Sequence, residues 1–422
     1  MFAHLQSGSG LHTGSGLRKG AGPSRVGVVG SCLAAAGLAV AGIGLAAPAQ
    51  ASQAPTDAGL WSQARVVGQS AVAPSAAQTM TTKFRWADGS TVKATVVSGS
   101  GAKEVAGADI SNRTVAWTKW DQMVGVLSDG RGVGLKDGKL HYADAKGQLH
   151  LFNSGWTPTV DDAWLQGNRA YGVRYSAEKG GAQFFDLGSV GGKVSQDAPW
   201  LQGDTQNGSY AVHSGRVYWT RLVMSGGEPV RAEVVSRSMK GGAVRLEAKS
   251  ASDPSIVDGG VGVVTHKNVT GDWTGGPVTG AKLLGGKNLV SYTGTWPNAG
   301  GPDDGMAELM LSGHTVAVAN VGGKGTIIMD TKAKKAWWVS APGKALAMRP
   351  TIGSNRVVWP WLEMGNPSAV ANRQISVFDA GKLRKLTANG NPQQAFTNGG
   401  AVAYSAIAPS DGRDSFAAMR VR

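Results

Sequence analysis

Short apolar runs separated by turn-forming residues recur along most of the chain. The clearest is Val357-Val358-Trp359, which follows Gly353-Ser354-Asn355 and has the β-branched and aromatic composition of a buried strand. The residues before it tolerate a left-handed backbone, so a tight turn is expected there. Residues 374–379 alternate apolar and polar positions, as a half-buried strand does. Residues 379–382 then predict a hairpin turn, and residues 383–386 its returning strand.

The same order of turn, apolar strand and hairpin recurs along the chain. The recurring turns begin at Asn112, Asn168, Ser214, Asp258, Ser312, Ser354 and Asn398. Their average separation of about 48 residues is close to the roughly 40–50 residues of a four-stranded blade. One such unit cannot bury both faces of its small sheet, but units stacked around an axis can. The pattern predicts an all-β fold, a single β-propeller of seven four-stranded blades, with six or eight blades as alternatives.

The N-terminal part of the chain follows other patterns. Residues 83–86 and 91–97 alternate around an Asp-Gly turn and predict a hairpin. This hairpin lacks the recurring unit, so we expect it to contribute to a blade completed elsewhere. Residues 52–80 are rich in Ala, Ser, Gln and Pro, which favours a flexible spacer. The propeller domain is then expected to span residues 81–422.

Residues 1–51 have the pattern of a secretory signal peptide. Arg18, Lys19 and Arg25 are followed by small apolar residues from 26 to 47 and by Ala49-Gln50-Ala51, a cleavage-site pattern. An uncleaved membrane anchor is the alternative, because the apolar run is just long enough to span a bilayer. Cleavage would remove Cys32, the single cysteine, and with it any disulfide or cysteine-ligated metal.

The strong positive charge bears on location and partners. The formal net charge is +14, and the signal segment holds three basic and no acidic residues, which leaves about +11. A basic exported protein tends to bind anionic polymers or lipid surfaces. A basic surface without a partner is the alternative. We expect a secreted or extracytoplasmic protein, with cell-wall association as an option, that is monomeric, has no transmembrane helix after signal removal and binds no nucleic acid.

Candidate catalytic groups are few. Asp161-Asp162 and Asp303-Asp304 could supply a general acid and base for a glycosidic bond, although paired Asp residues in loops also serve as solvated turn formers. The histidines lack the spacing of metal ligands. No nucleophile, phosphate-loop or dinucleotide motif occurs. The sequence therefore gives no catalytic residue, no metal site and no cofactor, and a non-catalytic role is preferred.

Tryptophan is unusually frequent, with 14 residues. Several lie between an expected apolar strand and the following hairpin, in loops that share one face of a propeller. The ligand-binding residues predicted on this rim are Trp120, Asp121, Arg221, Trp273, Trp361 and Glu363. Aromatic faces with nearby polar groups suit sugar rings or peptides, whereas the alternative is that these indoles cover blade edges. Trp337 and Trp338 are neighbours on one expected strand, so one of them must face outward.

The stretch Ile375-Ser376-Val377-Phe378-Asp379-Ala380-Gly381-Lys382-Leu383-Arg384-Lys385-Leu386-Thr387 resembles the repeats of TolB-like and WD40-like secreted bacterial β-propellers. The resemblance extends over about residues 83–422 and implies architecture rather than activity, because propellers host enzymes, sensors and scaffolds. We expect a secreted or cell-surface, non-catalytic binding or scaffold propeller. Its ligand would be a polysaccharide, an anionic cell-wall polymer or a protein. The alternative is a polysaccharide-active hydrolase or lyase that uses carboxylates at the propeller mouth.

Overall fold

The computed structural model describes residues 78–100, 102–104, 114–115, 120–144, 146–194, 200–202, 207–226, 228–267, 277–294, 308–319, 325–363, 365–366, 374–387, 391–407 and 414–420. The chain divides into two compact units, residues 1–56 and 57–422, and every described residue belongs to the second. All elements assigned in these ranges are β-strands. The same ranges contain no helix that is long and apolar enough to cross a membrane.

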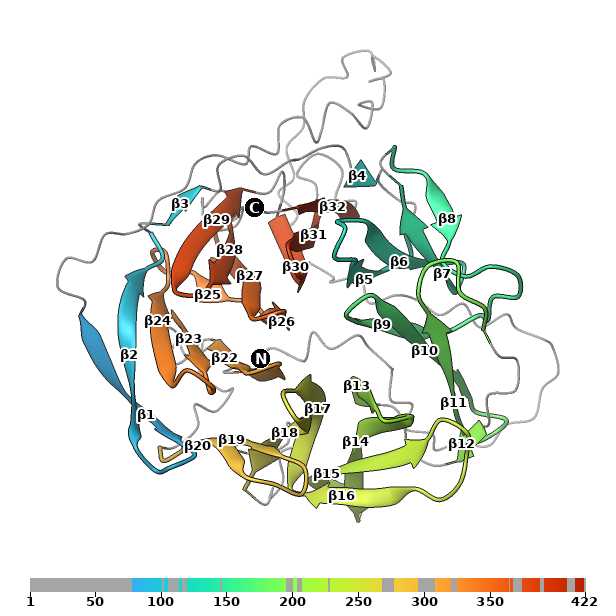
Figure 1. The fold of residues 1–422 in the computed structure, drawn as a ribbon, viewed down its shortest axis with the longest axis horizontal. Coiled ribbons are helices and arrows are strands. Elements are labelled where there is room, and N and C mark those ends of the chain that lie inside the picture. The colour runs from blue at the N-terminus through green and yellow to red at the C-terminus, as the bar shows by residue number, and fades with distance from the viewer. Residues whose placement is uncertain are drawn as a thin grey trace, which may run out of the picture. The chain divides into compact units, whose positions relative to one another are not determined.

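The strands of this unit form small sheets around a central axis, as in a β-propeller (Figure 1). Blade 1 consists of β5 (Gln122–Val126), β6 (Gly132–Lys136), β7 (Lys139–Ala143) and β8 (Leu149–Leu151). Blade 2 consists of β9 (Asp162–Gln166), β10 (Arg169–Ser176), β11 (Gly181–Gly188) and β12 (Trp200–Gln202). Blade 3 consists of β13 (Asn207–His213), β14 (Arg216–Ser225), β15 (Glu228–Ser238) and β16 (Arg245–Lys249).

The other blades have the same antiparallel order. Blade 4 consists of β17 (Ala251–Val257), β18 (Gly260–His266), β19 (Val278–Leu283) and β20 (Asn288–Tyr292). Blade 5 consists of β21 (Glu308–Ser312), β22 (Thr315–Ala319), β23 (Gly325–Asp330) and β24 (Lys335–Ser340). Blade 6 consists of β25 (Leu346–Ala347), β26 (Thr351–Gly353), β27 (Arg356–Leu362), β28 (Gln374–Asp379) and β29 (Lys382–Thr387). Blade 7 consists of β30 (Asn391–Asn398), β31 (Ala401–Ile407), β32 (Asp414–Arg420) and β4 (Thr114–Val115).

The all-β propeller expected from the sequence is therefore present. Blades 1 to 7 are those that can be traced among the described residues, and the blade number of the whole chain stays a prediction. The domain limits at residues 51 and 80 also stay predictions. Residues 79 and 80, however, already belong to β1 (Thr79–Trp86) rather than to a spacer.

The N-terminal strands cover the outer edges of blades 4 to 7. β1 pairs with β20, and β2 (Thr91–Ser98) pairs in parallel with β24, so the hairpin joins blades 4 and 5 into one ten-stranded sheet. β3 (Lys103–Glu104) adds to β29 of blade 6, and β4 pairs with β32 of blade 7. The hairpin contributes to blades whose other strands lie elsewhere in the chain, as expected, and it extends two blades that already have four strands. The strand that completes blade 7 is β4.

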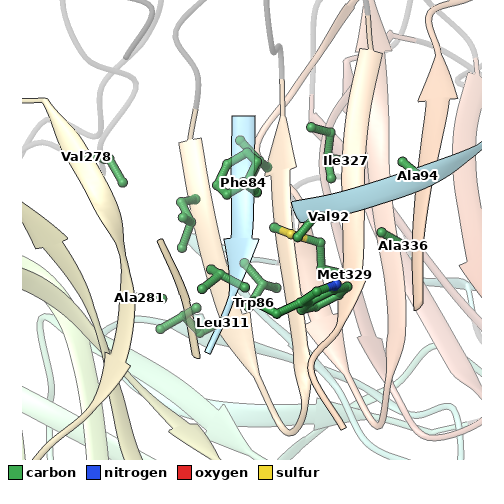
Figure 2. Close-up of a cluster of buried hydrophobic side chains, with 14 of the residues drawn as sticks. Phe84, Trp86, Val92, Ala94, Val278, Ala281, Leu311, Ile327, Met329 and Ala336 are labelled. Atoms are coloured by element: carbon green, nitrogen blue, oxygen red, sulfur yellow. The ribbon is translucent and has the colours of Figure 1, made fainter. Parts of the chain in front are cut away.

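The hairpin is held by the hydrophobic cluster shown in Figure 2. Phe84 and Trp86 of β1 alternate with outward residues and pack with Leu311 and Met329 of blade 5. Val92 of β2 is fully buried in the same cluster. An alternating strand with one apolar face can close the edge of a sheet without exposing that face to water.

The recurring turns connect the first strand of a blade to its second strand. This holds at Asn168, Ser214, Asp258 and Ser354, each of which is followed by a largely buried second strand. The turn expected at Asn112 is different, because residues 114–115 form β4 and the described turn of blade 1 lies at residues 128–130. Thr114 and Val115 have strand-forming side chains, and the sequence pattern alone does not say which blade they join.

Candidate functional site

The first strands of the blades line a central cavity of about 270 Å³. Every blade contributes to it. The lining segments are 124–126, 164–167, 209–211, 254–256, 311–312, 351–354 and 396–398. Because these strands run in the same direction, their turns meet at one end of the cavity and their first residues at the other.

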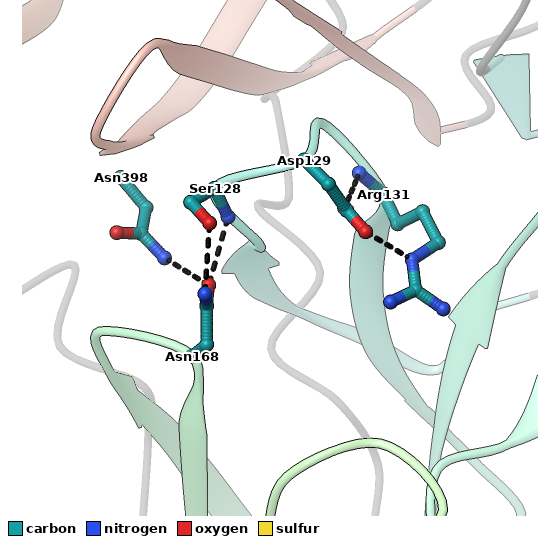
Figure 3. Close-up of polar contacts among 5 residues, drawn as sticks. All are labelled: Ser128, Asp129, Arg131, Asn168 and Asn398. Carbon is teal, nitrogen blue, oxygen red and sulfur yellow. Dashed lines mark hydrogen bonds and ion pairs between the residues drawn. The ribbon is translucent and has the colours of Figure 1, made fainter.

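At one end of the cavity, hydrogen bonds join turns of different blades, and we call this set of contacts the turn belt (Figure 3). The Asn168 side chain accepts a hydrogen bond from the Ser128 backbone N–H (2.9 Å) and donates one to the Ser128 hydroxyl (2.8 Å). Asn398 donates to the Asn168 amide oxygen (3.0 Å) and to the Gly167 carbonyl (2.9 Å). Blade 1 lies between blades 2 and 7, so this contact shows that the turns converge near the axis.

The turn belt continues through blades 4 to 7. His314 Nδ1 lies 3.1 Å from the Asp258 carboxylate, and the Gly399 N–H donates to the Ser354 hydroxyl (3.2 Å). Gly313 has a φ of +56°, and a Cβ added to it would lie 3.0 Å from the Asn355 amide oxygen. Glycine is required there because only a residue without a side chain combines this backbone with so close an approach.

The other end carries polar residues at equivalent positions, which we call the mouth ring. Each lies four residues before the last paired residue of the first strand. The members are Gln122, Asp162, Ser209, Asp253, Glu308, Arg349 and Gln394. Their common position places them toward the other end of the first strands, away from the turn belt, and Ser209 is the member that is among the residues lining the cavity.

Side-chain contacts link several members of the mouth ring across blades. Gln122 donates a hydrogen bond to Asp162 (3.1 Å) and thereby joins blades 1 and 2. Arg349 lies 3.9 Å from the Asp253 carboxylate and 3.5 Å from the Glu308 carboxylate, so blades 4, 5 and 6 meet at its guanidinium. These distances make Arg349 a neighbouring charge rather than a close hydrogen-bond partner.

The carboxyl groups of the mouth ring are recessed. Burial raises the pKa of Asp162 to about 6, and the Ala163 N–H and Gln122 only partly offset it. The pKa of Glu308 is also raised, mainly by burial. The charge of Arg349 lowers this pKa, and the charge of Asp253 raises it. The Glu308 side chain is 40% exposed, so water reaches it although protein surrounds most of it.

Asp253 is held in an unusual conformation. Its φ is +50°, its carboxylate accepts a hydrogen bond from the Ser252 hydroxyl (2.6 Å), and its backbone N–H donates to Thr220 (3.0 Å). Left-handed backbone at a residue other than glycine costs free energy and persists where neighbours impose it. The position of this carboxylate is therefore fixed by blades 3 and 4 together.

The structure places two predicted rim residues within blade 1. The Trp120 ring is half-buried and lies over Gly134, where an added Cβ would come within 2.3 Å of the ring. The exposed Asp121 accepts a hydrogen bond from the Asp137 backbone N–H. Both residues thus have packing or turn-stabilising contacts of their own blade.

The other predicted rim residues also have contacts within their own blades. Arg221 donates to Glu233 (2.7 Å), a carboxylate whose side chain is only 2% exposed. Glu363 accepts a hydrogen bond from Asn366 (3.4 Å) in blade 6. Trp273 lies outside the described residues.

Trp361 requires a correction. Its side chain is 1% exposed, its indole N–H donates to Ser376 (2.8 Å), and its ring packs edge-on against Trp359 with centroids 5.8 Å apart. A ring so buried offers no face to a ligand. Trp361 is a packing residue between blades 5 and 6, the alternative considered for these tryptophans.

The mouth ring was not predicted from the sequence as a group. Asp162 was considered only as part of an adjacent pair with Asp161, and Asp253, Glu308 and Arg349 were not candidates. The sequence feature that could have revealed the mouth ring is a polar residue at a constant distance before each recurring turn. The described residues contain no group of three His, Cys, Asp or Glu side chains that could hold a metal ion.

No family model and no curated protein matches this chain. Solved structures do match it. The designed protein Ika8 is 15% identical with a TM-score of 0.42, covering 72% of this chain and 98% of its own. A streptogramin B lyase is 13% identical with a TM-score of 0.42, covering 74% and 96%. TolB from Agrobacterium tumefaciens is 9% identical with a TM-score of 0.29, covering 71% and 90%.

These similarities are low, and the assignment to the β-propellers rests on the sheets themselves (Figure 1). The TolB-like part of the expected resemblance stays a prediction, and so does the WD40-like part.

Proposed function

We propose that the chain is a secreted or cell-surface binding propeller that does no chemistry and takes its ligand at the mouth ring. The observation that supports this proposal most is the contrast between the two ends of the central cavity. Turn-to-turn hydrogen bonds join the blades at one end, whereas the other presents partly exposed polar groups from several blades. A concave site with a few converging polar groups is the usual form of a ligand site.

The contacts of the acids favour binding over catalysis. Asp162 accepts from Gln122, while Arg349 lies beside both Asp253 and Glu308. A general acid or base has to reach a reacting atom, whereas Asp162 is already bound by Gln122 and the other two carboxylates lie beside a cation. The proposed ligand is a polysaccharide, an anionic cell-wall polymer or a protein, and location outside the cytoplasm is part of the proposal.

The proposal is tested by pull-down of the chain from Ser52 on cell-wall and polysaccharide fractions. Arg349→Gln should reduce retention about tenfold, the scale of losing one important charged contact. Arg169→Gln is the matched control, because it removes the same charge from an exposed pair with Asp186 in blade 2. Equal retention of the two variants would contradict a site at the mouth ring.

A second candidate function is a polysaccharide hydrolase or lyase. The observation in its favour is that Asp162 and Glu308 both have a raised pKa, which suits a general acid. Incubation of the chain with a glycan panel should then release products, and Glu308→Gln should abolish that release. Absence of products from every glycan that the pull-down retains would eliminate this candidate.

A further inference from the structure

A second cavity lies between blades 5 and 6 on the side of the turn belt, away from the mouth ring. Its volume is about 240 Å³. Ile328, Trp337 and Phe378 supply its apolar lining. Polar groups from the turns and strand ends of both blades line the rest. The cavity is smaller than the roughly 300–1,000 Å³ of sites for drug-sized ligands, so it suits a ligand of about one ring.

Trp337 provides an aromatic surface in this cavity. It is half-buried, in contrast to the buried Trp338 beside it on β24, and its ring meets Phe378 in a T-shaped contact with centroids 5.2 Å apart. Gly381 has a φ of +87°, and an added Cβ would lie 3.0 Å from the indole nitrogen of Trp337. The turn after β28 therefore leaves room for the indole, which fixes its orientation.

The polar groups are held in place as firmly as the indole. The Asp330 carboxylate accepts hydrogen bonds from the backbone N–H groups of Lys332 (3.0 Å) and Ala333 (2.8 Å). The Asp379 carboxylate accepts one from Arg356 (2.8 Å). Asn355 has a left-handed backbone with a φ of +65°. Such groups pay little entropy when a ligand donates hydrogen bonds to them.

The charge of Asp379 is largely compensated. Behind Asp379 lie the guanidinium groups of Arg356 and Arg384, whose side chains are each 9% exposed. Asp330 has the His314 imidazole as a neighbour, with Nε2 3.5 Å from its carboxylate. A carboxylate with a cation behind it remains a hydrogen-bond acceptor but attracts a second cation weakly. The cavity therefore favours neutral hydroxyl donors over an ammonium group.

We propose that this cavity binds one pyranose ring of an uncharged saccharide. The apolar face of the sugar would stack on Trp337, and its hydroxyl groups would donate to Asp330 and Asp379 and bond to Asn355. An aromatic surface beside a few fixed polar groups is the arrangement that orients such an amphipathic ring. This site is separate from the mouth ring and does not depend on the proposed function.

Saturation-transfer-difference NMR with methyl β-D-glucopyranoside, methyl α-D-mannopyranoside and N-acetylglucosamine tests the proposal. At least one of these glycosides should give signals with the wild-type chain. Trp337→Ala should weaken its binding at least about tenfold, the effect of removing an aromatic hot spot. Trp156→Ala is the matched control, since Trp156 is 40% exposed in the segment between blades 1 and 2 and should leave binding unchanged.

A second variant guards against misfolding of Trp337→Ala. Asn355→Gly removes the amide but keeps a residue that adopts the left-handed backbone, so it should fold and weaken binding about two- to tenfold, the range for one neutral hydrogen bond. Arg349→Gln at the mouth ring should leave glycoside binding unchanged, which separates this site from the proposed function. The proposal is overturned if no glycoside binds, if Asn355→Gly binds as well as wild type, or if tetramethylammonium displaces the glycoside.

Discussion

The two ends of the central cavity are built from different kinds of residue. At the turn belt, the neutral groups of Ser128, Asn168 and Asn398 form hydrogen bonds that join one turn to the next, and His314 lies beside Asp258. At the mouth ring, Asp253, Glu308 and Arg349 carry charges whose separations of 3.5–3.9 Å are longer than good hydrogen bonds. The hydrogen bonds of the turn belt satisfy polar groups of neighbouring turns, whereas the more loosely paired charges of the mouth ring keep capacity for a ligand.

This difference separates a structural role from a binding role. Neutral groups that hydrogen-bond one another stabilise the ring of blades, and each bond contributes about 0.5–1.5 kcal/mol. Loosely paired, partly exposed charges contribute little to stability. Substitutions at the turn belt should therefore change stability, and substitutions at the mouth ring should change binding more than stability.

The largest expected effect comes from Trp361, on the second strand of blade 6. Trp361→Ala removes a fully buried ring and its hydrogen bond to Ser376, and should lower the free energy of unfolding by about 3–5 kcal/mol. Urea denaturation of the two proteins measures the difference. Trp156→Ala, at a 40% exposed position, should cost much less. A melting temperature of Trp361→Ala near that of wild type would restore a surface role for this residue.

Trp361 also shows how far the sequence could be interpreted. The period of apolar strands and turns predicted the propeller, because burial of two sheet faces imposes that alternation on each blade. Whether an aromatic at a strand end faces a neighbouring blade or solvent depends on the packing of two segments distant in the chain. The sequence pattern does not say which distant segments pack together, and for this reason Trp361 was assigned to the rim.

The mouth ring is a set of residues that the sequence pattern did not bring together. Asp253, Glu308 and Arg349 lie in blades 4, 5 and 6 and meet only because the first strands converge on the axis. Each residue alone is an ordinary polar position at the beginning of a strand. Similarly, the pairing of β2 with β24 and of β4 with β32 joins residues more than 200 positions apart, which local patterning does not determine.

The next effect concerns the pH dependence of stability at the mouth ring. The pKa of Asp162 is about 6 in the folded chain, against 3.8 as its ordinary value. The folded state binds this proton more tightly, so the group stabilises the fold below about pH 3.8 and loses that contribution as pH rises through about 6. Because the side chain is partly exposed, its contribution to the free energy of unfolding of wild type should fall by about 1–2 kcal/mol between about pH 3.8 and 6.

Asp162→Asn should remove this part of the pH dependence. Its free energy of unfolding should therefore change less with pH than that of wild type across the interval from about pH 4 to 7. Urea denaturation at several pH values measures the two slopes. Identical slopes would mean that Asp162 is solvated like an ordinary surface carboxylate.

A smaller loss is expected at the turn belt. Asn168→Ala removes hydrogen bonds to Ser128 and Asn398 and should cost about 1 kcal/mol, because the residue is exposed and water replaces part of the bonding. The same loss should appear at every pH, since no group in this contact titrates. A stability equal to wild type would indicate that the blades hold their ring without the belt.

The smallest effect on stability should come from Arg349, and it is the one that tests the comparison most directly. The guanidinium is 44% exposed and lies 3.5 Å or more from both carboxylates, so Arg349→Gln should change the free energy of unfolding by no more than about 0.5 kcal/mol. Without its charge, the pKa of Glu308 should rise further, because Arg349 is the neighbour that lowers it. If Arg349→Gln instead destabilises the chain as much as Asn168→Ala does, the mouth ring is a structural contact like the turn belt, and the two ends of the cavity do not differ in role.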